Sequence, residues 1–260
     1  MAAVAGPTFL GIGAQKAGTT WLYGMLRRHP DIGMPEQKEL HFWDRHEPDA
    51  AAVSGYLDSF AGLRGRARGE ITPSYAILPA ERIAAVRRHL PELRLLFVMR
   101  NPVERAWSQA RMELARALHR GEAIPESAWS QWLTAQLGSA SSLQRGDYAA
   151  CLRNWLKHYP REHFLVTVHE ENHRAPRDFL ADCAQHLGVD PDFYSSLTSA
   201  SLDETVLPET VLLGFKPVDL PSKPPQLYAE GLLKLYAPLV QETEALLDRP
   251  LAELWLAPYR

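Results

Sequence analysis

Short apolar segments that alternate with helical ones constrain the fold of this chain more than any other feature. Four of them have the length and hydrophobicity of strands, and they lie at 8–14, 67–71, 93–99 and 163–169. Helices are predicted between and after them from periodicity and from start and stop signals, at 18–29, 79–90, 102–119, 148–158 and 176–187. Strands that alternate with helices favour a parallel sheet covered on both faces. We therefore predict an α/β fold with a parallel β-sheet sandwiched between helices.

The C-terminal part of the chain differs from this alternation. A stretch rich in proline and glycine at 207–223 is predicted to be a loop, and 226–247 is predicted to be a helix. Nothing in the composition marks a second domain. We expect one domain over 1–260 that ends in this helical segment.

The overall charge and the cysteine count exclude several classes of function. A net charge of −3 gives no general attraction to nucleic acid or membranes, so neither is expected as a partner. The only cysteines, Cys151 and Cys183, are too few for a disulfide framework, and the ten histidines lack metal-ligand spacing. The N-terminus lacks the pattern of a signal peptide, and no apolar run reaches the ~20 residues of a membrane span. We expect a metal-independent protein of the cytoplasm.

A glycine-rich loop, Gly13–Thr20, joins the first predicted strand to the helix that follows it. Backbone N–H groups of such a turn and of the helix N-terminus point at one place, where the helix dipole favours an anion. Lys16 adds a positive charge, and Thr19 and Thr20 add hydroxyl donors. The sheet is therefore predicted to be P-loop-like, with a phosphate group bound at the loop. A tight turn with solvated polar side chains is the alternative.

The loop lacks two parts of the loop found in nucleoside triphosphatases. Their pattern has a lysine directly after the second glycine, where this chain has Thr19, and its own lysine lies earlier, at position 16. No later strand ends in an aspartate that could hold magnesium, since the strand at 93–99 is followed by Arg100. These differences argue against ATP hydrolysis.

Two motifs together resemble the sulfotransferases that use 3′-phosphoadenosine 5′-phosphosulfate (PAPS). The sequence from Gly13 to Trp21 is similar to their 5′-phosphosulfate loop, and Arg100 to Ser108 is similar to their 3′-phosphate motif. The resemblance implies PAPS as donor and adenosine 3′,5′-bisphosphate (PAP) as product. It implies that the residues that bind them include Gln15, Lys16, Ala17, Gly18, Thr19, Thr20, Trp21, Arg100 and Ser108.

Further segments, at 38–44, 70–75 and 146–170, resemble the heparan-sulfate-type and bacterial branch of this family. The last of them adds Tyr148 to the residues implied to bind the donor. Lys16 is implied to neutralise the bridging oxygen as the donor bond breaks. The glutamate implicated as general base in that branch matches Glu39; His41 is the competing candidate, because cytosolic sulfotransferases use a histidine from a different motif. A third possibility is that 38–44 is only scaffold.

The late loop matches the pattern of the family less well than the other segments. Enzymes of the family commonly close the donor site with a loop that carries lysine and glycine, so 207–223 and the helix at 226–247 are predicted to cover that site. Lys216 and Lys223 are the candidates, although neither has the usual pattern and each could be a solvated lysine. Glu70 could orient Lys16 or the acceptor, or could be an ordinary glutamate at a strand end.

The resemblance predicts sulfuryl transfer from PAPS to a hydroxyl or amine by in-line displacement. The acceptor is expected to be a small molecule or a carbohydrate, and the oligomeric state is not predicted. Two other functions remain open: a small-molecule kinase with a divergent phosphate loop, and a nucleotide-binding module without catalysis.

Overall fold

A computed structural model describes residues 6–203 and 218–259 of the chain. Two compact units make up the fold. Unit 1 comprises Met1–Met99 and Arg153–Val206, and unit 2 comprises Arg100–Leu152 and Leu207–Arg260.

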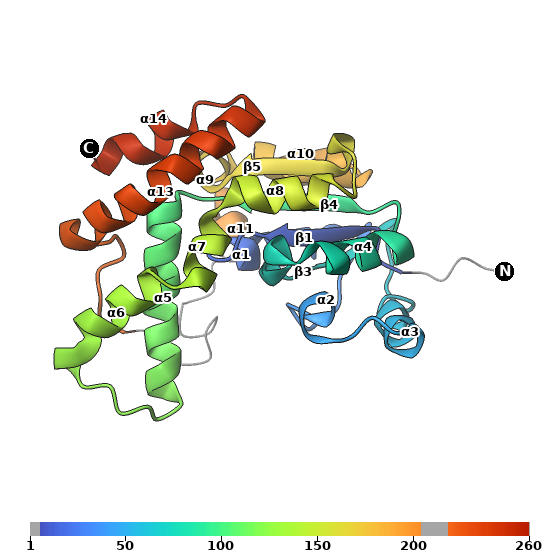
Figure 1. The fold of residues 1–260 in the computed structure, drawn as a ribbon. Helices are drawn as coiled ribbons and strands as arrows, with labels where there is room; N and C mark the ends of the chain where they lie inside the picture. The colour runs from blue at the N-terminus through green and yellow to red at the C-terminus, as the bar shows by residue number, and fades with distance from the viewer. Residues whose placement is uncertain (1–5, 204–217, 260) are drawn as a thin grey trace. The chain divides into compact units, whose positions relative to one another are not determined.

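Unit 1 is built on a five-stranded sheet in the order β2-β3-β1-β4-β5 (Figure 1). All neighbouring strands are parallel. The strands are β1 (Phe9–Gly13), β2 (Ile32–Gly33), β3 (Ala67–Ile71), β4 (Arg94–Met99) and β5 (Phe164–Val168). β1 lies in the middle, with Phe9 opposite both Gly69 of β3 and Arg94 of β4. The carboxyl ends of the strands therefore share one edge, the edge at which such sheets bind ligands.

Helices cover both faces of this sheet. The helices are α1 (Thr19–Leu26), α2 (Phe42–Arg45), α3 (Ala50–Asp58), α4 (Ala80–His89), α9 (His169–Arg174), α10 (Pro176–Leu187) and α11 (Ser199–Asp203), and α8 (Tyr148–Leu156) crosses into unit 1 at Arg153. Figure 1 shows α4 in front of the sheet and α10 behind it. Every residue of β1 is buried, as are five of the six residues of β4, which is why both read as continuous apolar runs in the sequence.

Unit 2 consists of helices. They are α5 (Pro102–His119), α6 (Trp129–Leu137), α7 (Ala140–Gly146), α13 (Gln226–Leu247) and α14 (Leu251–Leu256). α5 begins with Pro102 directly after Asn101, whose side chain accepts a hydrogen bond from the Val103 amide at 3.0 Å, an N-cap that ends the preceding extended chain. Trp107 and Tyr236 belong to the hydrophobic core that joins α5, α6 and α13.

A fully buried arginine ties three helices of unit 2 together. The guanidinium of Arg105 donates to Gln109 Oε1 at 2.6 Å, to the Ser142 carbonyl at 2.7 Å and to the Tyr236 hydroxyl at 3.2 Å. These acceptors come from α5, α7 and α13. All of them are neutral, so hydrogen bonds compensate for the burial of this charge.

The predicted α/β fold, with its P-loop-like parallel sheet between helices and its C-terminal helical segment, is confirmed. The four predicted strands are present with ends shifted by one residue at most; 163–169 is too long at its end because His169 already begins α9. Strand β2 and helices α2, α3, α6, α7, α9, α11 and α14 are not in the prediction. Most of the predicted loop at 207–223 lies outside the described residues. The single domain over 1–260 stays a prediction. In the described part of the chain, no helix is long and apolar enough to cross a membrane.

Candidate active site

The Gly13–Thr20 loop leaves the carboxyl end of the central strand and enters α1. The Ala14 amide donates to the Val98 carbonyl at 2.7 Å, which holds the start of the loop against β4. Gly18 adopts φ 79° as the N-cap of α1, a conformation that favours glycine. The first turn of an α-helix has N–H groups without acceptors inside the helix, so this turn can bind an anion.

Within this loop, the predicted residues differ in their exposure. Thr19 is buried, whereas Lys16, Thr20 and Trp21 are half-buried. The Gln15 side-chain oxygen is buried and has no hydrogen-bond partner among the described residues. The loop therefore offers a lysine and a threonine hydroxyl at a partly open surface.

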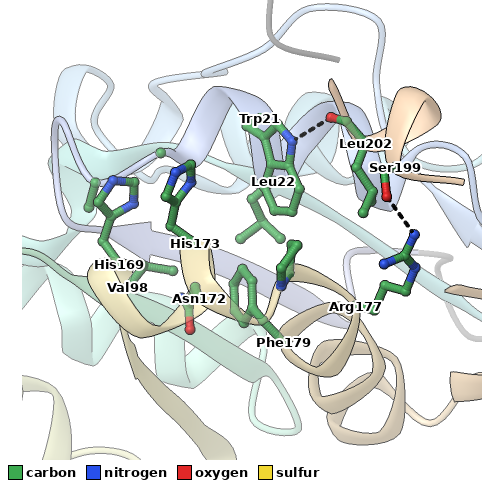
Figure 2. A pocket seen from close by; sticks show the side chains of 13 residues that line it. Trp21, Leu22, Val98, His169, Asn172, His173, Arg177, Phe179, Ser199 and Leu202 are labelled. Carbon is green, nitrogen blue, oxygen red and sulfur yellow. Dashed lines mark hydrogen bonds between the residues drawn. The ribbon is translucent and has the colours of Figure 1, made fainter. Parts of the chain in front are cut away.

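A cavity of about 540 Å³ opens beside the loop (Figure 2). Ala17 and Gly18 of the loop form part of its wall, and Trp21 and Phe179 lie in it with nearly parallel rings, their centroids 6.4 Å apart. The Trp21 indole donates to the Leu202 carbonyl at 3.1 Å, which fixes the ring. Cavities of about 300–1,000 Å³ with apolar walls and few polar groups are typical ligand sites.

Polar groups line the same cavity at the end of β5. His169 and Asn172 come from α9, and Arg177 comes from α10, where it donates to the Ser199 hydroxyl at 3.3 Å. His169 is so close to the loop that a Cβ on Gly18 would lie 3.0 Å from its Nδ1. The cavity therefore continues directly from the phosphate loop.

Glu39 and His41 belong to one hydrogen-bonded row of side chains. His41 Nε2 lies 3.2 Å from Glu39 Oε2, and His41 Nδ1 lies 2.8 Å from Asp44 Oδ2. Lys38 forms an ion pair with the other Glu39 oxygen. The Glu39 side chain is 36% exposed, whereas those of His41 and Asp44 are 16% and 18% exposed. Of these three side chains, Glu39 is thus the one most open to a substrate, with His41 behind it.

A buried carboxylate on the strand next to β1 lies at the centre of a second cluster. Glu70 is 1% exposed and accepts hydrogen bonds from the hydroxyls of Thr72 at 2.6 Å, Tyr75 at 2.7 Å and Tyr56 at 3.3 Å. The Leu40 amide is 3.4 Å from its Oε2. Burial raises the pKa of Glu70, and this effect outweighs the hydrogen bonds, which lower the pKa. Burial also raises the pKa of Tyr56 and Tyr75, so both remain neutral donors.

The three predicted catalytic residues share an uncommon backbone conformation. Lys16, Glu39 and His41 have φ of 67°, 64° and 54°. In the described chain, Asp248 is the only other non-glycine residue with positive φ. Such conformations cost about 1–2 kcal/mol for an L-residue and often occur at functional sites.

The predicted 3′-phosphate residues lie in unit 2. Arg100 is half-buried and forms an ion pair with Glu104 at 3.2 Å, and Ser108 is half-buried in the second turn of α5. The hydroxyl of Tyr148 donates to the Arg100 carbonyl at 2.6 Å and accepts from the Arg100 amide at 3.3 Å. Tyr148 is 1% exposed, so the structure places it as a support for the Arg100 backbone.

The structure tests neither of the two lysines predicted to close the donor site. Lys216 lies outside the described residues, and Lys223 is exposed. The roles predicted for both stay predictions. In the described ranges, no group of three or more histidine, cysteine and acidic side chains could hold a metal ion.

The sequence prediction did not include several residues of the cavity wall. Asn172, Phe179 and Leu202 were not singled out, and His169 appeared only within a longer resembling segment. The available signal was a polar pair directly after a buried strand, His169-Glu170, at the edge where the loop also lies.

The fold and this site define a class: parallel α/β proteins with a glycine-rich loop after the central strand and a glutamate–histidine turn that is hydrogen-bonded to Glu70 of β3 and to Thr72. More specifically, the chain belongs to the sulfotransferase domain family, whose model matches residues 7–206.

Curated relatives of the chain are heparan sulfate glucosamine 3-O-sulfotransferases. Isoform 6 from Mus musculus is 30% identical over 208 residues, which cover 74% of this chain and 56% of that protein. Isoform 3B1 from Homo sapiens is 34% identical over 195 residues, which cover 72% of this chain and 45% of that protein. The chain thus spans about half the length of these relatives.

Two solved structures have a similar fold. A sulfotransferase from Alicyclobacillus acidocaldarius is 28% identical, with a TM-score of 0.68 and coverage of 95% of this chain and 98% of that one. A mouse sulfotransferase complexed with PAP is 15% identical, with a TM-score of 0.56 and coverage of 92% of this chain and 85% of that one. The second likeness supports the fold alone.

Proposed function

We propose that the chain transfers a sulfuryl group from PAPS to a hydroxyl group of a carbohydrate acceptor, by in-line displacement. Membership of the sulfotransferase family supports the reaction type. The observation that carries the proposal is the cavity that begins at Ala17 and Gly18 of the phosphate loop.

The cavity fits the nucleoside part of such a donor. A 5′-phosphate on the loop would have its nucleoside within reach of this wall, where the Trp21 ring offers a face for a base. His169 and Asn172 offer ring-nitrogen and amide groups that could hydrogen-bond to base edges. The loop has Thr19 where a triphosphatase loop has lysine, which favours this donor over Mg-ATP.

The side chains of unit 1 supply a consistent mechanism. Glu39 accepts the proton of the acceptor hydroxyl as its oxygen attacks sulfur. The bond between sulfur and the bridging oxygen of the 5′-phosphate breaks, and PAP leaves with the negative charge that Lys16 neutralises. His41, held by Asp44, hydrogen-bonds to the Glu39 carboxylate and keeps it oriented. In this arrangement Glu39 is the base that takes the proton, and His41 supports Glu39 without contacting the acceptor.

A carbohydrate acceptor is favoured by the names of the relatives, which are glucosamine 3-O-sulfotransferases. A small-molecule alcohol or amine is the alternative. The half-exposed position of Glu39 is compatible with an acceptor that approaches from solvent.

Calorimetry with PAP and with Mg-ATP tests the donor. We expect PAP to bind without magnesium, and Arg100→Ala to weaken it about tenfold or more, because a charge-assisted contact is worth about 1.5–3 kcal/mol. Binding of Mg-ATP instead of PAP would favour the kinase. PAP binding that Arg100→Ala leaves unchanged would contradict the assignment of this arginine.

Transfer of labelled sulfate from PAPS to glucosamine-containing oligosaccharides tests the reaction. Glu39→Gln should lower kcat about 100- to 10,000-fold, the usual contribution of a general base, and leave the Kd of PAP nearly unchanged. Glu36→Gln is the matched control, since Glu36 is exposed and lies three residues away. PAP binding without transfer to any sugar, alcohol or amine would instead support a module without catalysis.

A further inference from the structure

We propose that Glu70 is a positioning residue for this reaction, which acts with Thr72 and Tyr75 to fix the turn that carries Glu39 and His41. The inference rests on the proposed function, in which Glu39 is the base. It concerns a group that cannot touch the substrate, because Glu70 is 1% exposed and Tyr75 is fully buried.

Three consecutive backbone amides of the turn are held by this cluster. The Leu40 amide donates to Glu70 Oε2 at 3.4 Å, the His41 amide to Thr72 Oγ1 at 3.4 Å, and the Phe42 amide to the Tyr75 hydroxyl at 3.0 Å. The turn therefore has an anchor at each residue that follows Glu39.

Glu70 also orients the other two anchors. Its Oε2 accepts from the Thr72 hydroxyl, and its Oε1 accepts from the Tyr75 hydroxyl. Each hydroxyl thus donates to the carboxylate, which leaves its oxygen lone pairs directed to the amides of the turn. Only a group that accepts on both oxygens can hold both hydroxyls in this way.

The turn needs such anchors because its own conformation is unfavourable. Glu39 and His41 both have positive φ, at a cost of about 1–2 kcal/mol each. Without the cluster, these residues would relax toward ordinary backbone angles and move the Glu39 carboxylate. A displacement of about 1 Å can reduce turnover about 100-fold.

The anchors lie in β3 and in the short segment that directly follows it: Glu70 is in the strand, Thr72 comes just after its end, and Tyr75 is in the 3-10 helix Pro73–Ile77. The Thr72 amide donates to the Gly11 carbonyl at 3.0 Å, two residues before the loop begins at Gly13. Glu70 therefore fixes the base-bearing turn to the strand next to the one that carries the loop.

Glu70→Gln is the direct test. The substitution replaces one acceptor oxygen by an NH2 group, which then faces either Tyr75 and Tyr56 or Thr72 and Leu40, all of them donors. We expect kcat to fall about 10- to 100-fold while the Kd of PAP changes less than about twofold. Tyr75→Phe should act in the same direction, because it removes the acceptor of the Phe42 amide.

Tyr56→Phe is the matched control. It removes one hydrogen bond to Glu70 but no anchor of the turn, and it keeps the ring stacked on Phe42 at 4.6 Å. It should retain kcat within about threefold. A loss as large as that of Glu70→Gln would show that the cluster supports only the fold, and would overturn the proposal.

Two further readouts separate positioning from general destabilisation. If Glu70 acts through Glu39, the double variant Glu39→Gln/Glu70→Gln should be no slower than Glu39→Gln alone. Independent of activity, the amides of 40–42 should exchange hydrogen faster in Glu70→Gln than in Tyr56→Phe. Unchanged exchange would overturn the inference. An unmodified protein that transfers no sulfuryl group would contradict the proposed function, whatever the exchange result.

Discussion

Replacement of Gly18 by alanine tests the phosphate loop most directly. At φ 79° the new methyl group carries a strain of about 1–2 kcal/mol, and its Cβ would lie 3.0 Å from His169 Nδ1, closer than the usual ~3.5–4.0 Å separation of non-bonded atoms. Either His169 or the first turn of α1 must move. The amides that we propose to bind the 5′-phosphate lie in that turn, so we expect PAP to bind at least about tenfold more weakly.

Gly188→Ala is the matched control for this prediction. Gly188 ends α10 at φ 76°, and a Cβ there would contact nothing within 4 Å. The backbone strain is therefore the same, but the contact with His169 is absent. Both variants should lose about 1–2 kcal/mol of stability, or about 2–8 °C in Tm, with the larger loss for Gly18→Ala.

Thermal denaturation measures the Tm of the two variants, and calorimetry measures their affinity for PAP. The expected pattern is a loss of Tm in both variants, larger in Gly18→Ala, and a loss of PAP affinity in Gly18→Ala alone. Equal PAP affinity in the two variants would refute the reasoning, because it would show that the geometry at Gly18 does not matter for the donor.

Three further predictions concern buried or half-buried groups. Arg105→Ala should lower stability by about 3 kcal/mol in thermal denaturation, because it leaves buried acceptors unpaired; a change below about 1 kcal/mol would contradict that role. Burial raises the pKa of Cys151 to about 12 and that of Cys183 further, so neither thiol should react with a thiol reagent at pH 8 until the protein is denatured. Burial lowers the pKa of His186, so the unfolded chain takes up its proton first and stability should fall as pH drops below about 6.5; His186→Gln should flatten that fall in Tm, and an unchanged slope would argue against it.

The sheet could be predicted from the sequence because its strands are buried on both faces. β4 is a continuous apolar run, and β1 leads directly into a glycine loop, so both elements have local signals. Strand β2 has only two residues, and α2 only four, which is too short for any periodicity to be visible. Their conformation is set by tertiary contacts, such as the hydrogen bond from the Phe42 amide to Tyr75.

The site was predictable where residues lie close together along the chain. Lys16 and Gly18 are in one loop, and Glu39 and His41 are two residues apart. Each pair therefore lies within one short motif and could be predicted from the sequence alone. Their connection to Glu70 spans about 30 residues and exists only through folding. For the same reason the cavity wall at Phe179 and Leu202 could not be assigned to the site from the sequence.

The positive φ angles of Lys16, Glu39 and His41 affect how this protein will respond to engineering. A substitution to glycine at any of these positions relieves backbone strain and removes a side chain that the chemistry needs. A selection for heat resistance alone would therefore enrich inactive variants at these three positions. Libraries that seek a more robust enzyme should hold these codons fixed and vary Asp248 instead, where the same relief is available at a residue to which no catalytic or binding role is assigned.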